Sequence, residues 1–466
     1  MYIMKIKNNL TKDEKIKIKK KYLITKKRVF LITLFVIGFI GLLIPLRPKK
    51  SVLEKRELEK FPKFTLSSFW DGSYFSAIST WYADTFPFRE QLLSANSSFK
   101  NLYGVQGEQI VMNTEQTADE IPTGSLVLPE TSEAESQESE AETEVETEEE
   151  TYEDGAIHDV PEMSGNVYVT GDTAFSVFYF DLNGSNAYIQ MMNKAQKRLD
   201  GIADVYDILV PTSLGICLDE DAQKEIGASL QNDAMDYVVS SINSINNKVK
   251  TVNTFDTLKK HNSEYIYFRT DHHWTALGAY YAYQDFCKVK GIEAESINSF
   301  ETMEFPGFVG SFYASSNQVA SLKENPDTVT AYIPKDTNDM FFYDSSLQKI
   351  NWKIINDVSE YSENSKYATF IAGDEIYAQI DNPVLDDGSS CVVIKESFGD
   401  AFIPFLVDHY QHIYIVDYRY FYKYPEYNNS IYELVKDKNV QDVIFINNAS
   451  AMTTEKSAAL MSELFD

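Results

Sequence analysis

Two stretches of the chain carry side chains that could do chemistry together. The first, Thr270–Trp274, holds Asp271 and His273 two residues apart. In extended backbone such residues share one face, so the Asp271 carboxylate could bind one ring nitrogen of His273 and leave the other exposed to a substrate. A histidine held in this way can act as a general base toward a hydroxyl group. A buried helix-capping pair is the alternative interpretation.

The second stretch offers the hydroxyl group. Ser397 follows the apolar run Cys391–Ile394 and precedes helical spacing from Ala401, so it falls in a sharp turn between a predicted strand and a predicted helix. Amides that open such a helix would point toward an oxyanion formed at Ser397. The two stretches together predict an Asp271, His273 and Ser397 triad, although Ser397 by itself could be an ordinary turn serine.

The elements that must position these residues alternate between strands and helices. The aromatic run Tyr265–Phe268 predicts a strand, and Thr275 is a candidate N-cap for a helix that reaches Cys287. Further strands are predicted at 167–170, 175–180, 205–212, 248–252, 391–394, 413–416 and 442–446, and helices at 186–199, 222–243, 254–260, 401–410 and 429–436. Residues 331–380 are expected to form antiparallel strands. Such alternation predicts an α/β fold with a parallel sheet covered by helices, whose ligands bind at the carboxyl ends of the strands.

Further polar residues fall at predicted strand ends or in the glycine-containing loop 305–313. We expect four of them to bind substrate: Arg419, Asn447, Ser311 and Asp417. Gly310 or Ser311, together with Asn447, are candidate oxyanion donors, and Arg419 is the candidate for gripping a substrate oxygen. A salt bridge between Asp417 and Arg419 at the sheet edge is the alternative.

Composition excludes several classes of function. A net charge of −28 argues against a nucleic-acid partner. The three cysteines, Cys217, Cys287 and Cys391, are odd in number and far apart, which is typical of buried hydrophobic side chains rather than of a disulfide framework. The six histidines are too scattered for a zinc pattern, so we expect neither a metal nor a cofactor.

The N-terminal part predicts a membrane anchor. Residues 1–28 contain eleven Lys or Arg and two acids, and residues 29–46 carry no charge. As a helix this run would extend about 27 Å, enough to span a bilayer core, with the basic end in the cytoplasm. No small-x-small site follows it, so an uncleaved, single-pass anchor in the cell membrane is favoured over a cleaved signal peptide.

Three regions follow the anchor. Residues 47–107 are expected to form a juxtamembrane segment that packs on the main domain, with a merely solvated segment as the alternative. Residues 108–163 form an acidic insert, in which Glu130–Asp154 holds thirteen acids and no base, a composition that predicts disorder. Residues 164–466 form the globular domain, which the anchor would place outside the cytoplasm.

Several motifs together resemble the DHHW protein family: Thr270–Thr275, Glu54–Arg56, Asp84–Arg89, Lys395–Phe398 and Asp417–Arg419. That family is similar to the periplasmic alginate O-acetyltransferases of the SGNH hydrolase superfamily. The resemblance implies an SGNH hydrolase-like three-layer α/β/α core and acetyl transfer to or from a polysaccharide hydroxyl. It also implies that Asp271 orients His273, that His273 acts as the base, and that Ser397 carries the acetyl group.

Three functions from different classes follow. The first is an O-acetyltransferase or acetylesterase acting on a cell-surface or exported polysaccharide, with a membrane-bound O-acyltransferase as the partner that donates acetyl groups. The second is a non-catalytic polysaccharide-binding module of the same fold, for which 30 Tyr and 29 Phe offer rings that stack on sugars. The third takes Asp-His-His as the manganese motif of a phosphoesterase, which would need further Asp or His ligands.

Overall fold

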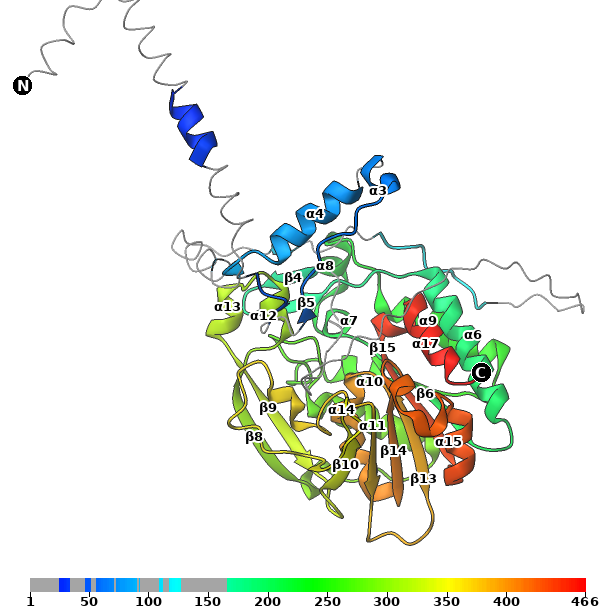
Figure 1. Ribbon diagram of the computed structural model, residues 1–466. Coiled ribbons are helices and arrows are strands. Elements are labelled where there is room, and N and C mark those ends of the chain that lie inside the picture. The colour runs from blue at the N-terminus through cyan, green and yellow to red at the C-terminus, as the bar shows by residue number, and fades with distance from the viewer. Residues whose placement is uncertain are drawn as a thin grey trace, which may run out of the picture. The chain divides into compact units, whose positions relative to one another are not determined.

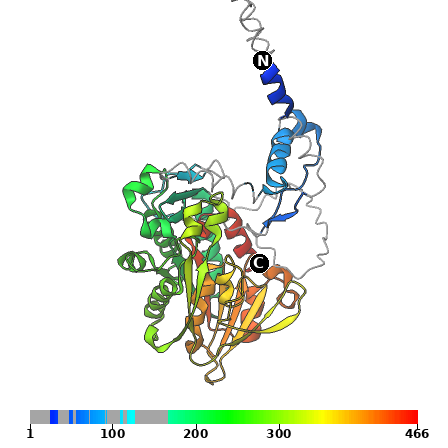
Figure 2. The ribbon, with the colours of Figure 1, turned by 90° about the vertical axis from the view of Figure 1, so that its left-hand side faces the viewer.

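The computed structural model describes residues 25–33, 47–51, 56–70, 73–89, 92, 109–111, 117–126 and 166–466. The chain divides into two compact units, Met1–Ala95 and Asn96–Asp466. The larger unit contains the predicted triad, and Figures 1 and 2 show its sheet and helices from two directions.

An eight-stranded mixed sheet organises the larger unit (Figure 1), in the order β11-β10-β12-β14-β13-β15-β6-β7. Five neighbouring strands are parallel: β14 (His412–Asp417), β13 (Ser390–Lys395), β15 (Asp442–Asn448), β6 (Asp204–Val210) and β7 (Lys250–Asn253). Three strands at one edge are antiparallel: β12 (Tyr377–Asp381), β10 (Asp339–Tyr343) and β11 (Lys349–Lys353). The predicted parallel sheet is therefore correct for five strands, and an antiparallel meander extends it.

Helices cover this sheet because its central strands are apolar on both faces. Every residue of β13 and nearly every residue of β6 and β15 is buried, as expected for parallel strands between two helical layers. One group of helices that pack together is α6 (Leu182–Leu199), α9 (Gln231–Ile245) and α17 (Glu455–Glu463). A second group is α10 (Phe255–Lys260), α11 (Ala276–Lys290) and α14 (Phe398–Phe402). Both groups contact the strands, and Figure 1 shows them apart.

Two predicted helices differ from those observed, each for a local backbone reason. The predicted helix 222–243 is divided into α8 (Glu220–Glu225) and α9, and Gly227 between them has a φ of 75°, which glycine adopts at little cost. The predicted helix 401–410 begins earlier, as α14, and continues as the 3-10 helix η4 (Ile403–His409). Pro404 lacks the amide that would continue the α-helical hydrogen bonds.

The strand predicted at Tyr265–Phe268 does not form. The run makes an isolated bridge between Tyr267 and Trp274, and its backbone bonds close back on the following turn. Phe268 N donates to His273 O over 3.2 Å, and Thr275 N donates to Ile266 O over 2.9 Å. The aromatic residues are thus one arm of a tight loop before α11 and lie outside the main sheet.

Two smaller sheets complete the larger unit. Strand β3 (Gln109–Val111) pairs with β4 (Val167–Thr170), which pairs with β5 (Thr173–Ser176), while β8 (Glu301–Phe308) pairs with β9 (Asp327–Ile333). Residues 109–111 and part of 117–126 therefore belong to the folded unit, although the predicted acidic insert begins at 108. The acidic run 130–154 lies outside the described residues, so its predicted disorder stays a prediction.

The smaller unit contains β1 (Lys50–Ser51), β2 (Arg56–Glu57), α3 (Leu66–Trp70) and α4 (Ser73–Asp84). The guanidinium of Arg47 lies 4.1 Å from the ring centre of Trp81 and donates to Thr85 over 2.6 Å. Asp84 accepts the amide of Glu59 over 2.8 Å. Packing of residues 47–107 on the main domain stays a prediction.

The predicted anchor falls mostly outside the described residues. Residues 25–33 are helical, and residues 34–46 are outside the description. None of the helices among the described residues combines the length and apolar character needed to cross a bilayer.

Of the three cysteines, Cys287 and Cys391 are buried as predicted, whereas Cys217 is exposed at the end of α7 (Ser213–Cys217).

Candidate active site

His273 lies between Asp271 and Ser397 and contacts both. Its Nδ1 is 2.6 Å from Asp271 Oδ1, and its Nε2 is 2.5 Å from Ser397 Oγ. The three residues are 4%, 6% and 4% exposed in the order Asp271, His273, Ser397. The fold thus brings Asp271 and His273 together with Ser397, which lies more than a hundred residues further along the chain. The residue types and their spacing predict this grouping.

The carboxylate of Asp271 fixes the tautomer of His273. Burial opposes its charge, but the imidazoles of His273 and His272 and the amide of Ser311 hold the pKa of Asp271 well below its ordinary value. An ionised carboxylate can only accept hydrogen bonds, so Nδ1 of His273 must donate and Nε2 is left as the acceptor for the Ser397 hydroxyl. This is the arrangement that general-base activation of a serine requires.

Hydrogen bonds link the loop that carries Asp271 to the turn that carries Ser397. Thr275 caps α11 as predicted, since its Oγ1 accepts from Gly278 N over 3.4 Å, and it also donates to Tyr265 O over 2.8 Å. The indole Nε1 of Trp274 donates to Phe398 O over 3.0 Å. Because Phe398 follows Ser397, this bond links the two stretches that supply the triad.

Ser397 stands where the sequence predicts, between β13 and α14. The amides that follow it are already bonded within the turn. Phe398 N donates to the Glu396 carboxylate over 3.1 Å, Gly399 N to Glu396 O over 2.9 Å, and Asp400 N to Ser397 O over 3.2 Å. The same carboxylate lies 3.5 Å from Ser397 Oγ and accepts Asn448 N over 3.0 Å. These contacts differ from the predicted set of helix-opening amides turned toward an oxyanion.

Ser311 and Gly310 hold the histidine loop. Ser311 N donates to Asp271 Oδ2 over 2.8 Å, and Ser311 Oγ is 2.7 Å from His272 Nδ1. Gly310 N donates to Thr270 Oγ1 over 3.0 Å. Because both amides are engaged in positioning residues 270 and 271, these contacts argue against the predicted role of either residue as an oxyanion donor.

Arg419 and Asp417 form a salt bridge, which was the alternative to a substrate-binding role. Nε and Nη2 of Arg419 donate to the two carboxylate oxygens of Asp417 over 2.9 and 2.6 Å, and Nη2 also lies 2.8 Å from Asp374 Oδ1. Lys395, completely buried, joins the cluster at 2.7 Å from Asp374, 2.6 Å from Asp400 and 3.5 Å from Asp417. The guanidinium of Arg419 is thus held by the protein's own carboxylates.

The buried charges in this cluster influence one another. Burial alone would lower the pKa of Lys395, but the three carboxylates raise it well above its ordinary value. Burial raises the pKa of Asp400 well above its ordinary value, despite the opposing effect of Lys395. Two cationic side chains, Lys395 and Arg419, thus lie among the carboxyl groups of Asp374, Asp400 and Asp417 next to the Ser397 turn.

Asn447 lies in the core, and its contacts argue against the predicted substrate-binding role. Strand β15 continues to Asn448, so Asn447 is still inside the sheet and is completely buried. Its Nδ2 donates to the hydroxyl of Tyr188 over 3.2 Å, and that hydroxyl donates to Asp207 Oδ1 over 2.6 Å. The predicted strand 442–446 ends two residues too early. The backbone amide of the next residue, Asn448, donates to Glu396 beside Ser397.

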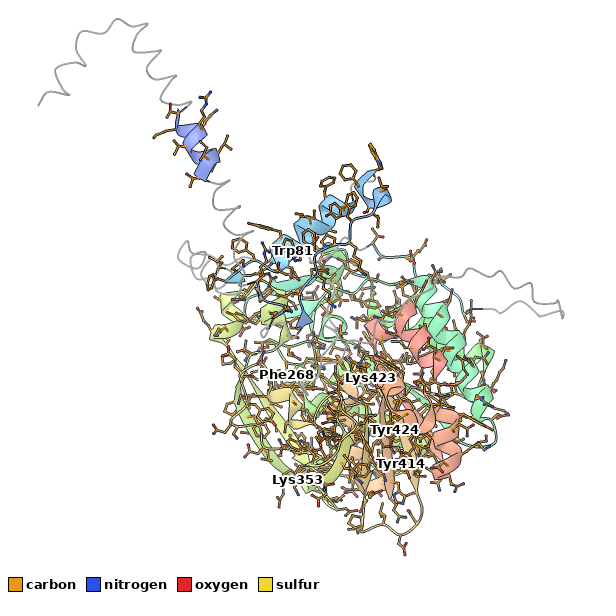
Figure 3. The ribbon with its side chains drawn as sticks, viewed as in Figure 1. Trp81, Phe268, Lys353, Tyr414, Lys423 and Tyr424 are labelled. Carbon is orange, nitrogen blue, oxygen red and sulfur yellow. The ribbon has the colours of Figure 1, made fainter. Side chains whose placement is uncertain are left out.

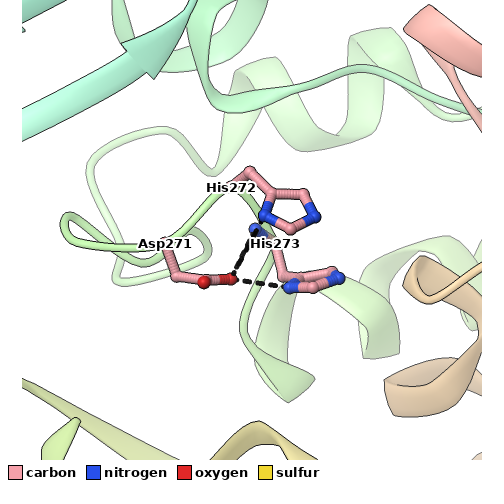
Figure 4. A group of neighbouring side chains, drawn as sticks. All are labelled: Asp271, His272 and His273. Atoms are coloured by element: carbon pink, nitrogen blue, oxygen red, sulfur yellow. Dashed lines mark hydrogen bonds and ion pairs between the residues drawn. The ribbon is translucent and has the colours of Figure 1, made fainter. Parts of the chain in front are cut away.

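Asp271, His272 and His273 are also the residues that a metal site would use (Figure 4). Their potential ligand atoms lie within 4.8 Å of one another. Both nitrogens of His273 are engaged, one with Asp271 and one with Ser397. A cation bound through His273 would have to displace the carboxylate or the hydroxyl, so the contacts of this ring fit a triad better than a metal centre.

Sequence reasoning missed Tyr367, which contacts two members of the triad. Its ring is stacked on the imidazole of His273, and its hydroxyl donates to Ser397 O over 3.0 Å. Tyr367 comes from a segment without regular periodicity, so no local signal marks it. The buried charge cluster was also not predicted. Its sequence signal is the position of Lys395 and Asp417, each of which stands at the end of an apolar run.

The fold and the site together define an α/β protein with a Ser–His–Asp arrangement at the carboxyl end of a parallel strand. The family model of the DHHW protein matches residues 54–153 and 139–416. The chain therefore belongs to the DHHW protein family, as its motifs indicate.

Several solved structures are similar to this chain. A DHHW family protein from Eubacterium siraeum is 28% identical, with a TM-score of 0.54, over 63% of this chain and 94% of that one. Bacillus cereus PatB1 is 20% identical, with a TM-score of 0.50, over 62% and 97% of the two chains. The O-acetyltransferase domain of Pseudomonas putida AlgJ is 14% identical, with a TM-score of 0.36, over 63% and 98%. No curated protein matches the chain.

Proposed function

We propose that this chain is an O-acetyltransferase or acetylesterase that modifies a polysaccharide and uses Ser397 as its nucleophile. The observation that carries the proposal is the position of His273, with Nδ1 on the Asp271 carboxylate and Nε2 on the Ser397 hydroxyl. That geometry supports hydroxyl activation, because Nε2 is placed to take the Ser397 proton and Asp271 is placed to stabilise the imidazolium that results.

The reaction follows from these contacts. Ser397 Oγ attacks the carbonyl carbon of an acetyl donor while its proton passes to Nε2 of His273, and Asp271 stabilises the imidazolium that forms. The imidazolium then returns the proton to the leaving group, and an acetyl ester remains on Ser397. A sugar hydroxyl or water attacks this ester while His273 takes its proton. The bond between Ser397 Oγ and the acetyl group then breaks, and His273 returns the proton to Ser397 Oγ. Transfer and hydrolysis differ only in this second nucleophile.

The choice of acetyl group and polysaccharide rests on the family. The motifs of DHHW proteins resemble those of the alginate O-acetyltransferases, which suggests acetyl transfer to a sugar hydroxyl. The predicted anchor at 29–46 would hold the site outside the cytoplasm and beside the membrane. A membrane-bound O-acyltransferase would then be a suitable acetyl donor, since it would reach the same surface.

Hydrolysis of a chromogenic acetyl ester by the full chain in detergent tests the proposal. Ser397→Ala and His273→Ala should each lower kcat/KM by roughly a thousandfold or more and leave the thermal unfolding transition in place. Ser430→Ala is the matched control, because Ser430 is an ordinary serine that caps α15 (Ile431–Lys438) through Glu433 N. Turnover by Ser397→Ala at the parental rate would remove the nucleophile assignment.

One observation favours the second candidate, a non-catalytic polysaccharide-binding module. The Glu396 carboxyl group lies beside the Ser397 hydroxyl and accepts the amide of Phe398, so this amide is not available as an oxyanion donor in the observed arrangement. A parent protein that binds acetylated polysaccharide but turns over no acetyl ester would support this candidate over the enzyme.

A further inference from the structure

Tyr367 contacts both the base and the nucleophile of the candidate triad. It lies in the 3-10 helix η3 (Lys366–Thr369), between β11 and β12. Its ring centre is 4.0 Å from that of the His273 imidazole, and the two planes are 9° apart. Its hydroxyl donates to the carbonyl oxygen of Ser397 over 3.0 Å. One side chain therefore connects two triad members that come from different loops.

The ring of Tyr367 is itself held in place. Phe268 (Figure 3) and Phe370 meet it edge to face, with ring centres 6.2 and 5.2 Å away. Burial, together with the nearby carboxylates of Asp400 and Asp271, raises the pKa of Tyr367 well above its ordinary value. The hydroxyl therefore keeps its proton and remains a donor to Ser397.

We propose that Tyr367 is a positioning residue of the triad, which orients the imidazole of His273 through its ring and the backbone of Ser397 through its hydroxyl. The kinetic part of this proposal rests on the proposed function. The effect of the ring on His273 does not, because it concerns the imidazole in the resting protein.

The ring should also favour the charged form of His273. A cation over the face of an aromatic ring is attracted by its quadrupole, and a stacked phenol offers that face to an imidazolium. His273 becomes an imidazolium when it takes the serine proton. The stacked ring therefore stabilises the charged form of His273 that the reaction requires.

Several charged or titratable groups face His273 besides Tyr367. Asp271 and His272 belong to its own loop, and the imidazole ring of His272 is 3.8 Å away. Glu396 lies beside the Ser397 hydroxyl, with Lys395 and Asp400 behind the same turn. None of these groups changes when Tyr367 is replaced, so a shift in the pKa of His273 between variants reports the ring itself.

The test separates the ring from the hydroxyl by comparing Tyr367→Phe with Tyr367→Met. Phenylalanine keeps the stack and loses the bond to Ser397 O, while methionine fills the space without an aromatic face. The pKa of His273 is measured by NMR titration of the imidazole in the full chain, assigned with His273→Gln. We expect Tyr367→Met to lower this pKa by about 0.5 to 1 unit and Tyr367→Phe to leave it near the parental value.

Kinetics provide the second readout. Tyr367→Phe should reduce kcat for an acetyl ester by roughly 3- to 10-fold at an unchanged KM, since one hydrogen bond to the nucleophile's backbone is lost. Tyr361→Met is the matched control, because Tyr361 is an exposed tyrosine of the same segment.

Two results would overturn the proposal: a His273 pKa that is the same in Tyr367→Met as in the parent, or parental kcat in Tyr367→Phe. Should Tyr367→Met fail to fold, Tyr367→Phe still decides through kcat. If the parent itself turns over no ester, the proposed function fails, while the NMR titration still decides the role of the ring.

Discussion

Several groups surround and bind the carboxylate of Asp271, so the addition of a single atom beside it should change its position. It accepts from Nδ1 and N of His273 and from Ser311 N, and Gly310 lies directly against it. Because its pKa lies well below the ordinary range, Asp271 stays ionised at neutral pH and continues to orient His273. A carboxylate packed this closely has little room to adjust.

Gly310→Ala tests that packing at the scale of one methyl group. A Cβ at residue 310 would lie 2.2 Å from Asp271 Cβ and 2.4 Å from its Oδ2, while the φ of −82° is one that alanine adopts. Asp271 must therefore shift, and a displacement of about 1 Å in such a site can cost on the order of 100-fold in kcat.

The control for this variant is Gly124→Ala, where an added Cβ meets no heavy atom within 4 Å. Ester hydrolysis and thermal unfolding of both variants are the measurements. Full activity in Gly310→Ala would mean that the position of Asp271 does not govern the reaction.

Among the elements, the turn from β13 to α14 depends on the buried cluster behind it. Lys395 ends β13 and meets Asp374, Asp400 and Asp417, which come from a loop, from α14 and from the end of β14. Removing one partner of a buried ion pair leaves an uncompensated charge, which is more costly than the pair itself is stabilising.

Lys395→Met should therefore destabilise the fold by about 3–5 kcal/mol. Lys353→Met is the control, because Lys353 (Figure 3) pairs with Asp339 on the exposed edge of the sheet and should change stability by less than about 0.5 kcal/mol. Urea unfolding of the two variants measures the difference. Equal stabilities would show that the cluster contributes no more than a surface pair.

How well each element could be predicted depended on whether its signal was local. The apolar runs of β6, β13, β14 and β15 mark buried parallel strands, and all four were predicted within a few residues. Tyr265–Phe268 has the same composition, but its amides bond within a loop, which composition does not encode.

The site residues follow the same rule. Asp271, His273 and Ser397 were predictable because their types and local settings limit their chemistry. Asn447 was misplaced because β15 extends two residues beyond its apolar pattern. Tyr367 was missed because only the fold brings it to His273.

For the whole molecule, Asp207 should make the free energy of unfolding depend on pH. Burial raises the pKa of this carboxyl from 3.8 to about 7, and Tyr188 donates to its Oδ1. Between these two pKa values the folded chain keeps the proton and the unfolded chain releases it. The contribution is therefore fully present below about pH 4 and is lost as the pH rises toward 7.

Asp207→Asn should remove this loss, because an amide is neutral at every pH. The variant should gain stability relative to the parent as the pH rises from about 4 to 7, by up to roughly 4 kcal/mol for a shift of about three pKa units. Urea unfolding across this range is the measurement, with Asp339→Asn, at an exposed position at the start of β10, as the matched substitution. A constant difference between Asp207→Asn and the parent would contradict the buried, protonated state.

The central claim is that Asp271 and His273 activate the hydroxyl of Ser397 to accept an acetyl group. Its most direct test is to mix the full chain with a chromogenic acetyl ester, quench in acid, and locate the acetyl group by peptide mass spectrometry. The account predicts one acetyl group on Ser397 in the parent and none in His273→Ala. An unmodified Ser397 in a protein that hydrolyses the ester, or equal acetylation in His273→Ala, would contradict it.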